Sequence, residues 1–205
     1  MRKIEKDLEK HILLIKNEEF RNNVRAILKL CPNYISEIAS SSTGKYHPAD
    51  EIASDGMLYH IERCVVLAPE IAIMNLHNAD QRDILIAGSI LHDLFKNGIP
   101  KVVDDKEVYD RFTNKDHEML IFDLITGYAE AIKDESEEQY KRVMTLGYIC
   151  GHHSGQWVPV SVAILERTLK YNFKEEDKRL AESMHIIDYV VSIRSFWEAM
   201  QDKRK

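Results

Sequence analysis

The sequence predicts an all-α fold, a single helical bundle that spans residues 1–205. Its apolar residues recur at spacings of three and four, as in amphipathic helices, rather than in the alternation typical of strands. Eight glycines and five prolines are few for this length, so long helices should be interrupted rarely. A hydrophobic fraction of 44% is enough for one buried core without disulfides.

Residues 1–40 are predicted to form an N-terminal helical extension. Two amphipathic helices are expected there, with apolar faces made by Ile4, Leu8, Ile12 and Ile15 and by Phe20, Val24, Ile27 and Leu28. Pro32 closes this region. The segment 37–56 is rich in Ser, Gly, Pro and Asp, which predicts mostly loop.

A core over residues 43–195 overlaps that loop and continues with further helices. A helix over 55–68 is expected to be broken or kinked by Pro69. The strongly apolar helix that follows has Asn78 or Asp80 as its cap and ends at His92, so it should be buried.

The second half of the core is predicted to begin with a polar connector over 102–112. Thr113 or Asn114 is expected to cap the next helix. The charged segment 134–143 opens another helix, which ends near Cys150 with Gly151 at its exit. Residues 154–160 should form a loop, and 175–200 the last long helix.

The charge balance excludes several classes of partner. A net charge of −6, with a basic cluster only at Lys203–Lys205, does not favour long nucleic acid. Charges interrupt the N-terminus, and no apolar run approaches the roughly 20 residues that span a bilayer, so we expect a cytoplasmic protein without membrane contact. Cys31, Cys64 and Cys150 are scattered, which predicts buried thiols in a reducing compartment.

Histidines and aspartates at the predicted helix ends form the notable pattern among the nine histidines. Five separate elements each bring one or two residues that can bind metal: His60, His92-Asp93, His117, His152-His153 and Asp188. Asp188 lies within an apolar stretch, where a carboxylate is costly unless it is paired or bound to a cation. Imidazole and carboxylate together favour divalent transition metals, namely Mn, Fe, Ni, Co or Zn.

The number of imidazoles exceeds what a single ion needs, so the sequence predicts two divalent ions. Asp93 can bridge them with its two oxygens, as in other two-metal sites that act on phosphoryl groups. Lys96 follows Asp93 by one turn and suits a phosphate oxygen or a developing negative charge. Asp93 and Lys96 are therefore the candidate catalytic residues, although Lys96 could equally be a surface lysine.

The order His60, His92-Asp93, Asp188, with every residue on a helix, resembles the metal-binding signature of the HD-domain phosphohydrolase superfamily. The form "HDLFK" resembles the branch that carries lysine three residues after the aspartate. His117 and His152-His153 resemble the added ligands of its binuclear members. These members include cyclic-dinucleotide phosphodiesterases and diadenosine-tetraphosphate hydrolases.

A closer match extends over most of the chain from residue 43. The segments "TGKYHPADEIASDGMLYHIERCV", "ILHDLFK", "GHHSGQW" and "HIIDYVVSI" resemble the HD domain of YhaM-type 3′-to-5′ exoribonucleases, in which His47 matches a histidine shortly before the first ligand. Phe95 departs from the glycine usual at its position. "GQW" replaces the Gly-Tyr-Pro signature of cyclic-di-GMP phosphodiesterases, which disfavours that activity.

The resemblance implies hydrolysis of a phosphoester or phosphodiester bond by metal-bound hydroxide. The substrate would be nucleotide-like: a nucleotide, a cyclic nucleotide or dinucleotide, or a short oligonucleotide. One ion would be held by His60, His92, Asp93 and Asp188, and the other by Asp93, His117, His152 and His153. Lys96 would contact phosphate.

His47, Trp157 and Arg194 are further candidates for substrate contacts, although loop packing or a surface ion pair would also explain them. Three alternatives to the hydrolase stay open. The chain could be a di-iron oxygenase on the same ligand set, a non-catalytic protein that binds or sequesters a nucleotide, or a structural helical adaptor. A homo-oligomer is compatible with the sequence.

Overall fold

The computed structural model describes residues 2–41, 47–155 and 170–193, and these are mainly helical, as the sequence predicts. The elements in chain order are α1 (Lys3–Ile12), α2 (Glu18–Leu30), the short 3-10 helices η1 (Tyr34–Glu37) and η2 (Ala49–Ile52), α3 (Gly56–Met74), α4 (Ala79–Leu91), the strands β1 (Lys101–Val103) and β2 (Lys106–Val108), α5 (His117–Ile132), α6 (Glu137–Gly151) and α8 (Glu175–Ser192).

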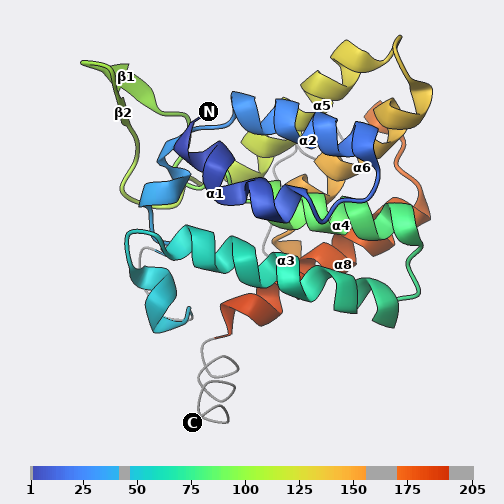
Figure 1. Cartoon of the computed structure of the whole chain (residues 1–205), viewed down its shortest axis with the longest axis horizontal. Helices are drawn as coiled ribbons and strands as arrows, with labels where there is room; N and C mark the ends of the chain where they lie inside the picture. The colour runs from blue at the N-terminus through green and yellow to red at the C-terminus, as the bar shows by residue number, and fades with distance from the viewer. Residues whose placement is uncertain (1, 42–46, 156–169, 194–205) are drawn as a thin grey trace.

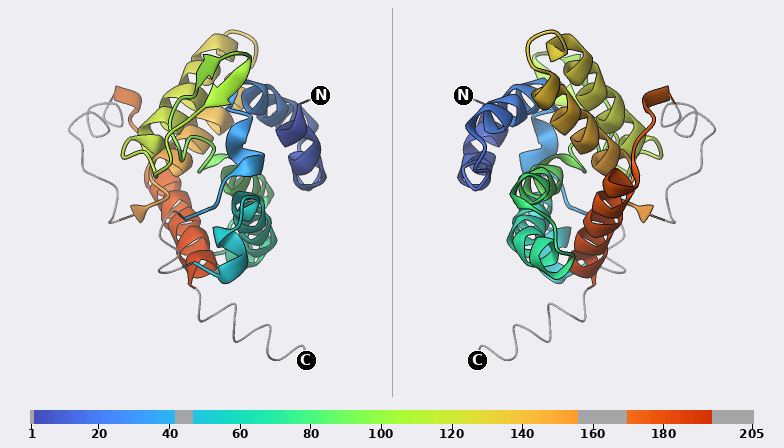
Figure 2. Two further views of the ribbon diagram at one scale, coloured as in Figure 1. Left: turned by 90° about the vertical axis from the view of Figure 1, so that its left-hand side faces the viewer. Right: turned by 90° about the vertical axis from the view of Figure 1, so that its right-hand side faces the viewer.

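Helix α4 lies at the centre of the bundle (Figure 1) and packs against α1, α3, α6 and α8. Every residue from Asp83 to Leu91 is buried, as expected for a helix that is apolar on nearly all sides. Figure 2 shows α3 and α8 side by side, with α5 and α6 forming an adjacent pair. Helix α4 therefore ends inside the protein, and His92 and Asp93, which follow its last residue, are buried.

The N-terminal helices belong to the same core as the rest of the bundle. Ile4 and Leu8 are buried in one cluster with the apolar residues of α4. Asp83 of α4 fixes the turn between α1 and α2, because its Oδ2 accepts hydrogen bonds of 2.8 Å from the backbone N–H groups of Lys16 and Asn17. The predicted extension is thus tied to the helix that leads to the candidate site.

Side-chain caps fix where several helices begin. Asn78 caps α4 in a capping box with Gln81, which confirms one of the two predicted caps. Ser136 caps α6 by accepting from the N–H of Gln139, and α6 ends at Gly151 as predicted. His152 and His153 follow directly in the turn after the helix.

Two predicted boundaries are wrong. Helix α3 does not end near Ala68 but continues through Pro69 to Met74, because the buried Ile71 and Ala72 keep the last turns packed on the core. The loss of one backbone hydrogen bond at a proline is smaller than this gain. Neither Thr113 nor Asn114 caps α5, whose N-cap position is Asp116.

The polar connector over 102–112 contains a β-hairpin, which the sequence analysis did not predict. Strands β1 and β2 pair antiparallel, with Val102 opposite Glu107. Asp104 and Asp105 both have positive φ, 49° and 59°, as a two-residue hairpin turn requires. The predicted loop at 156–160 and the end of the last helix after residue 193 lie outside the described residues.

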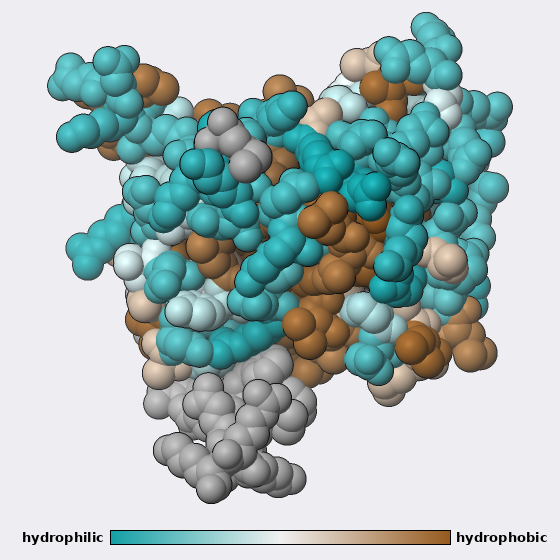
Figure 3. Space-filling model, in the orientation of Figure 1, coloured by the Kyte–Doolittle hydropathy of each residue, from teal (hydrophilic) through white to brown (hydrophobic). Residues whose placement is uncertain are grey.

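Apolar side chains also gather on part of the outer surface (Figure 3). On this face they lie near the turn after α1 and over α3, elements that expose Leu13, Leu14 and Val66. Among the described residues, no helix has both the length and the apolar character needed to cross a bilayer.

We expect Gly56→Ala to destabilise the fold, because an added Cβ would overlap the backbone carbonyl of Glu51. Overpacking of this kind costs about 1–3 kcal/mol. Gly127→Ala on α5 is the matched control: a Cβ there meets nothing within 4 Å, so the substitution should stabilise its helix by up to about 1 kcal/mol. Urea unfolding of both variants measures the difference, and equal stabilities would contradict the close packing of η2 on α3.

Candidate metal centre

The ends of helices far apart in the sequence meet at one buried place in the core. His60 on α3 and His92 at the end of α4 are fully buried, and Asp93 is 1% exposed. His117 at the start of α5 and His153 after α6 are also buried. Among the described residues, four overlapping sets of donor atoms could hold metal ions. The residues named above fall into two neighbouring groups, one around His60 and one around Asp93.

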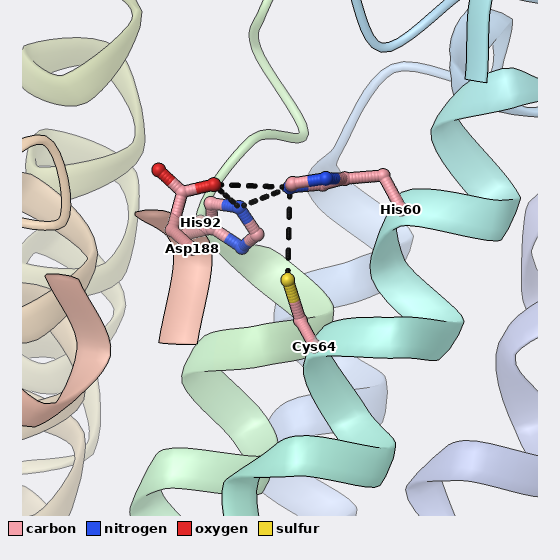
Figure 4. Close-up of side chains that lie close together, drawn as sticks. All are labelled: His60, Cys64, His92 and Asp188. Atoms are coloured by element: carbon pink, nitrogen blue, oxygen red, sulfur yellow. Dashed lines mark hydrogen bonds and ion pairs between the residues drawn. The ribbon is translucent and has the colours of Figure 1, made fainter. Parts of the chain in front are cut away.

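The first group joins α3, α4 and α8 (Figure 4). The Nε2 atom of His60 lies 3.2 Å from His92 Nε2 and 3.1 Å from Asp188 Oδ1. His92 Nε2 lies 3.8 Å from the same oxygen of Asp188. Cys64, one turn after His60 on α3, brings its Sγ to 3.6 Å from His60 Nε2. Two imidazoles, a carboxylate and a thiol therefore face one another.

The second group is arranged around the carboxylate of Asp93. Its Oδ1 lies 3.3 Å from His117 Nε2 and 3.4 Å from His153 Nε2. Its Oδ2 lies 3.6 Å from His92 Nε2 and 2.5 Å from Lys96 Nζ. Asp93 thus contacts a histidine of the first group, both histidines of the second, and the lysine.

The backbone sets the orientation of three of these rings. The Nδ1 atoms of His92, His117 and His153 lie 3.3, 2.8 and 2.7 Å from the carbonyl oxygens of Gly88, Asn114 and Cys150. Because a carbonyl oxygen only accepts, each Nδ1 carries the proton and each Nε2 presents a lone pair to the centre. This is how metal-ligating histidines are held in proteins.

Burial and neighbouring charges set the protonation of the central pair. Burial lowers the pKa of His92 to about 3, so the ring is neutral and able to bind a cation at neutral pH. Burial alone would raise the pKa of Asp93, but the positive charge of the nearby Lys96 lowers it well below its usual range. The carboxylate is therefore ionised in the folded protein at neutral pH.

The pKa values of His60 and His153 shift in the opposite direction. Burial disfavours their charged forms, yet Cys64 and Asp188 around His60, and Asp93 beside His153, outweigh it and raise both pKa values. Protons and metal ions therefore compete for these two rings. Metal affinity should fall as the pH is lowered.

A buried carboxylate supports His60 from the side away from the centre. Glu51 is fully buried, and its Oε2 lies 3.4 Å from His60 Nδ1 and 2.8 Å from His47 Nδ1. Ser40 Oγ donates to the same oxygen at 2.9 Å, and Arg63 pairs with Oε1. Burial would raise the pKa of Glu51, but these partners lower it well below its usual range. Glu51 therefore remains charged and directs His60 Nε2 inward.

Glu118 supports His117 in a similar way. Its Oε2 lies 3.1 Å from His117 Nδ1, and its Oε1 accepts a hydrogen bond of 2.8 Å from Ser154 Oγ. His117, Glu118 and His153 also form a group whose donor atoms are close enough to hold an ion. Each group thus has an acidic residue behind one of its imidazoles.

Most of the predicted ligands meet in the structure, but only one histidine of the pair after α6 is among them. His153 faces Asp93, whereas His152 is half-buried, stacks on Tyr148 with ring centroids 4.2 Å apart and places its Nδ1 2.8 Å from that residue's carbonyl oxygen. Among the described residues, the metal-competent groups include His153 and not His152. Of these two histidines, His153 is therefore the candidate ligand of the group around Asp93.

The predicted substrate contacts have different outcomes. Lys96 lies at the centre, but it pairs with Asp93. His47 contacts Glu51 and so supports His60 from outside. Trp157 and Arg194 lie outside the described residues.

Three residues of the centre were not predicted from the sequence: Glu51, Cys64 and Glu118. Cys64 follows His60 by four residues, a spacing that places two side chains on the same face of a helix. Glu118 directly follows His117, and this spacing did not single it out as a member of the site. Glu51 lies in a segment expected to be mostly loop, so its burial could not be anticipated.

The donor set fits divalent transition metals. Asp93 Oδ1 is buried and, among the described residues, lacks a hydrogen-bond partner, although two imidazole nitrogens lie within 3.4 Å of it. A buried carboxylate oxygen without a partner is costly unless a cation compensates it. The groups could therefore hold metal ions through His60, His92, Asp93, His117, His153 and Asp188.

Comparisons of the chain with models of protein families, with curated proteins and with solved structures returned no match.

We expect Glu51→Gln to weaken metal binding at the first group, because the neutral amide holds His60 less firmly. Loss of such an outer partner typically reduces metal affinity 10–100-fold. Asp50→Asn is the matched control, since Asp50 pairs with Arg63 and contacts no histidine of the centre. Titration calorimetry with Zn²⁺ measures both variants, and equal affinities would show that Glu51 does not orient His60.

Glu51→Gln should also change how the stability of the fold depends on pH in acid. Because the pKa of Glu51 is lowered in the folded state, its contribution to stability is full above the ordinary glutamate pKa of ~4.3. That contribution is lost as the pH falls from there toward the lowered native value. Glu51→Gln should therefore lose less stability than the wild type below about pH 4.3, as measured by thermal unfolding.

Proposed function

We propose that this protein is a metal-dependent phosphohydrolase of the HD type, acting on a phosphoester or phosphodiester bond of a nucleotide-like substrate. The observation that carries the proposal is the position of Asp93. One buried carboxylate contacts His92, His117 and His153 and also holds Lys96. This arrangement agrees with the residue order that resembles the HD superfamily.

The ligands would divide between two divalent ions. His60, His92 and Asp188 would hold the first, His117 and His153 the second, and Asp93 lies close enough to serve either position. Such ions can polarise a phosphoryl group and lower the pKa of a water molecule. Manganese, iron, nickel, cobalt and zinc all suit imidazole and carboxylate ligands.

Lys96 distinguishes phosphate chemistry from other uses of such a centre. Its side chain contacts the buried carboxylate and is 14% exposed, so part of it remains accessible to a ligand. An ammonium group has three donors, and the 2.5 Å contact with Asp93 uses one. The remaining donors can contact an anionic oxygen and stabilise negative charge that develops during the reaction.

A hollow lined by the residue after Lys96 is a candidate place for part of a nucleotide-like substrate. It has a volume of about 190 Å³, and its lining includes Glu37, Asn97, Tyr109, Arg111 and Thr113 but neither Lys96 nor a residue of the metal-competent groups. Asn97 follows Lys96 in the chain, so the hollow adjoins the turn that carries the lysine. The guanidinium of Arg111 and the ring of Tyr109 suit a second phosphate or a base, and the volume is enough for part of a nucleotide.

We expect Lys96→Met to lower kcat/KM about ten- to a hundredfold while the metal content stays unchanged. A charge-assisted contact is worth about 1.5–3 kcal/mol, and about 1.4 kcal/mol corresponds to a factor of ten. Methionine keeps the apolar stem and removes the charge. The substrate is found by a screen of nucleotides, cyclic dinucleotides and dinucleoside polyphosphates with Mn²⁺. Turnover is then compared with Lys133→Met, which changes an exposed lysine directly after α5.

Each outcome of the screen decides between the proposal and its alternatives. Turnover that depends on metal and on Lys96 supports the phosphohydrolase. Nucleotide binding without turnover would instead indicate a sensor or sequestering protein. Consumption of oxygen by the iron-loaded protein, with no phosphate released, would indicate an oxygenase.

A further inference from the structure

We infer that Cys64 is a metal ligand, so that the first position is a closed tetrahedral site of two imidazoles, one carboxylate and one thiolate that prefers zinc. The inference rests on the proposed metal centre and assigns its two positions different tasks. The first ion would hold the helices together, and the second, at Asp93, His117 and His153, would face the substrate. Neither the sequence pattern nor the resemblance assigns a role to Cys64.

Four of the six distances between the donor atoms are close to the edges of a tetrahedron, and the two that join Cys64 to His92 and to Asp188 are at most 4.8 Å. Zinc bonds of about 2.0–2.3 Å at tetrahedral angles give donor-to-donor distances of roughly 3.3–3.6 Å. Around His60 Nε2 the distances are 3.6 Å to Cys64 Sγ, 3.2 Å to His92 Nε2 and 3.1 Å to Asp188 Oδ1. The separation between His92 Nε2 and Asp188 Oδ1 is 3.8 Å, and all four donor atoms lie within 4.8 Å of one another.

The thiol points at this group. Figure 4 shows the sulfur of Cys64 directed along α3 toward His60 Nε2, the nitrogen that also faces His92 and Asp188. Cys64 and His60 are four residues apart on one helix face, and both are fully buried. The 3.6 Å between the sulfur and His60 Nε2 leaves no room for a water molecule between these two atoms.

Asp93 is not one of these four donors. Its Oδ2 lies 4.0 Å from His60 Nε2, farther than Asp188 Oδ1 at 3.1 Å and Cys64 Sγ at 3.6 Å, although it lies 3.6 Å from His92 Nε2. The carboxylate therefore lies between the two positions. With Cys64 as the fourth ligand, the first position is complete without Asp93. The carboxylate is then available to the second position, where three protein ligands leave room for a substrate.

The chemistry of the donors selects the metal. A thiolate is a soft ligand that favours zinc over manganese or magnesium, which prefer oxygen donors. On binding, the thiol releases its proton to solvent, and the thiolate and the Asp188 carboxylate together balance the charge of a divalent ion. The second position has only imidazole and carboxylate donors and lacks this preference.

Cys31 provides a matched control for an ordinary core cysteine. It is as buried as Cys64, but its Sγ lies 3.4 Å from the carbonyl oxygen of Ile27 in its own helix. Among the described residues it belongs to none of the groups that could hold a metal. Replacing Cys31 or Cys64 by alanine removes the same volume from the core, and only Cys64→Ala removes the proposed ligand.

The test uses the cobalt- and zinc-loaded full chain. We expect Co²⁺ in the wild type and in Cys31→Ala to give the near-ultraviolet thiolate-to-metal absorption, and Cys64→Ala to lose it. Zinc affinity of Cys64→Ala should fall at least tenfold, with circular dichroism showing whether the variant folds. X-ray absorption of the wild-type protein loaded with one equivalent of zinc, which should fill the first position, needs no variant and should show one sulfur neighbour at about 2.3 Å.

Two results would overturn the inference: a zinc shell of nitrogen and oxygen only in the wild type, or unchanged zinc affinity in folded Cys64→Ala. Phosphate release measured on the same samples separates this inference from the proposed function. A sulfur neighbour without turnover would leave the zinc site standing and remove the phosphohydrolase. Turnover without a sulfur neighbour would support the phosphohydrolase and remove the zinc site at Cys64.

Discussion

A buried negative charge at the end of a buried helix is the constraint around which this protein is organised. Asp93 is 1% exposed and remains ionised, so its charge must be compensated inside the core. Lys96 supplies one cation, and His117 and His153 approach the other oxygen. The packing of α4 on α1, α3, α6 and α8 makes this position inaccessible to bulk water, which strengthens every electrostatic interaction there.

The surrounding helices are arranged so that their polar ends meet this charge. Helix starts, helix ends and the turns after them supply His92, His117 and His153, and backbone carbonyls hold the Nδ1 atoms of all three. Side chains alone would allow each ring to flip and present either nitrogen. The backbone contacts remove that freedom, so the Nε2 atoms stay directed inward. For His60 the neighbour of Nδ1 is the carboxylate of Glu51, 3.4 Å away on the short helix η2.

The sequence predicted the fold because its helical periodicity is strong and its helices are long. Asn78 and Gly151 marked helix ends correctly: Asn78 caps α4, and Gly151 is the last residue of α6. The prediction that the helix ends near Pro69 was wrong because the packing of Ile71 and Ala72 on the core outweighs the local effect of the proline. The hairpin was missed because its pairing depends on a turn of two aspartates at positive φ, a conformation in which glycine or asparagine is more usual.

The candidate centre was predicted only in part, for a related reason. Histidine and aspartate at helix ends are conspicuous in a sequence, so six of the seven predicted ligands lie in the two groups. Which of His152 and His153 turns inward depends on the geometry of a single turn after α6. Cys64 and Glu51 were missed because a buried thiol, and a carboxylate in a segment expected to be loop, have ordinary explanations until their neighbours are known.

The metal content of the full chain tests most directly whether this buried cluster binds metal. Protein prepared without chelators and equilibrated with Zn²⁺ or Mn²⁺ would be desalted, and its bound metal measured by mass spectrometry against protein concentration. We expect close to two ions per chain, and close to one in His117→Ala, which lacks a ligand of the second position. A wild-type value near zero would show that the charge of Asp93 is balanced by Lys96 and the histidines alone, and would contradict the metal centre.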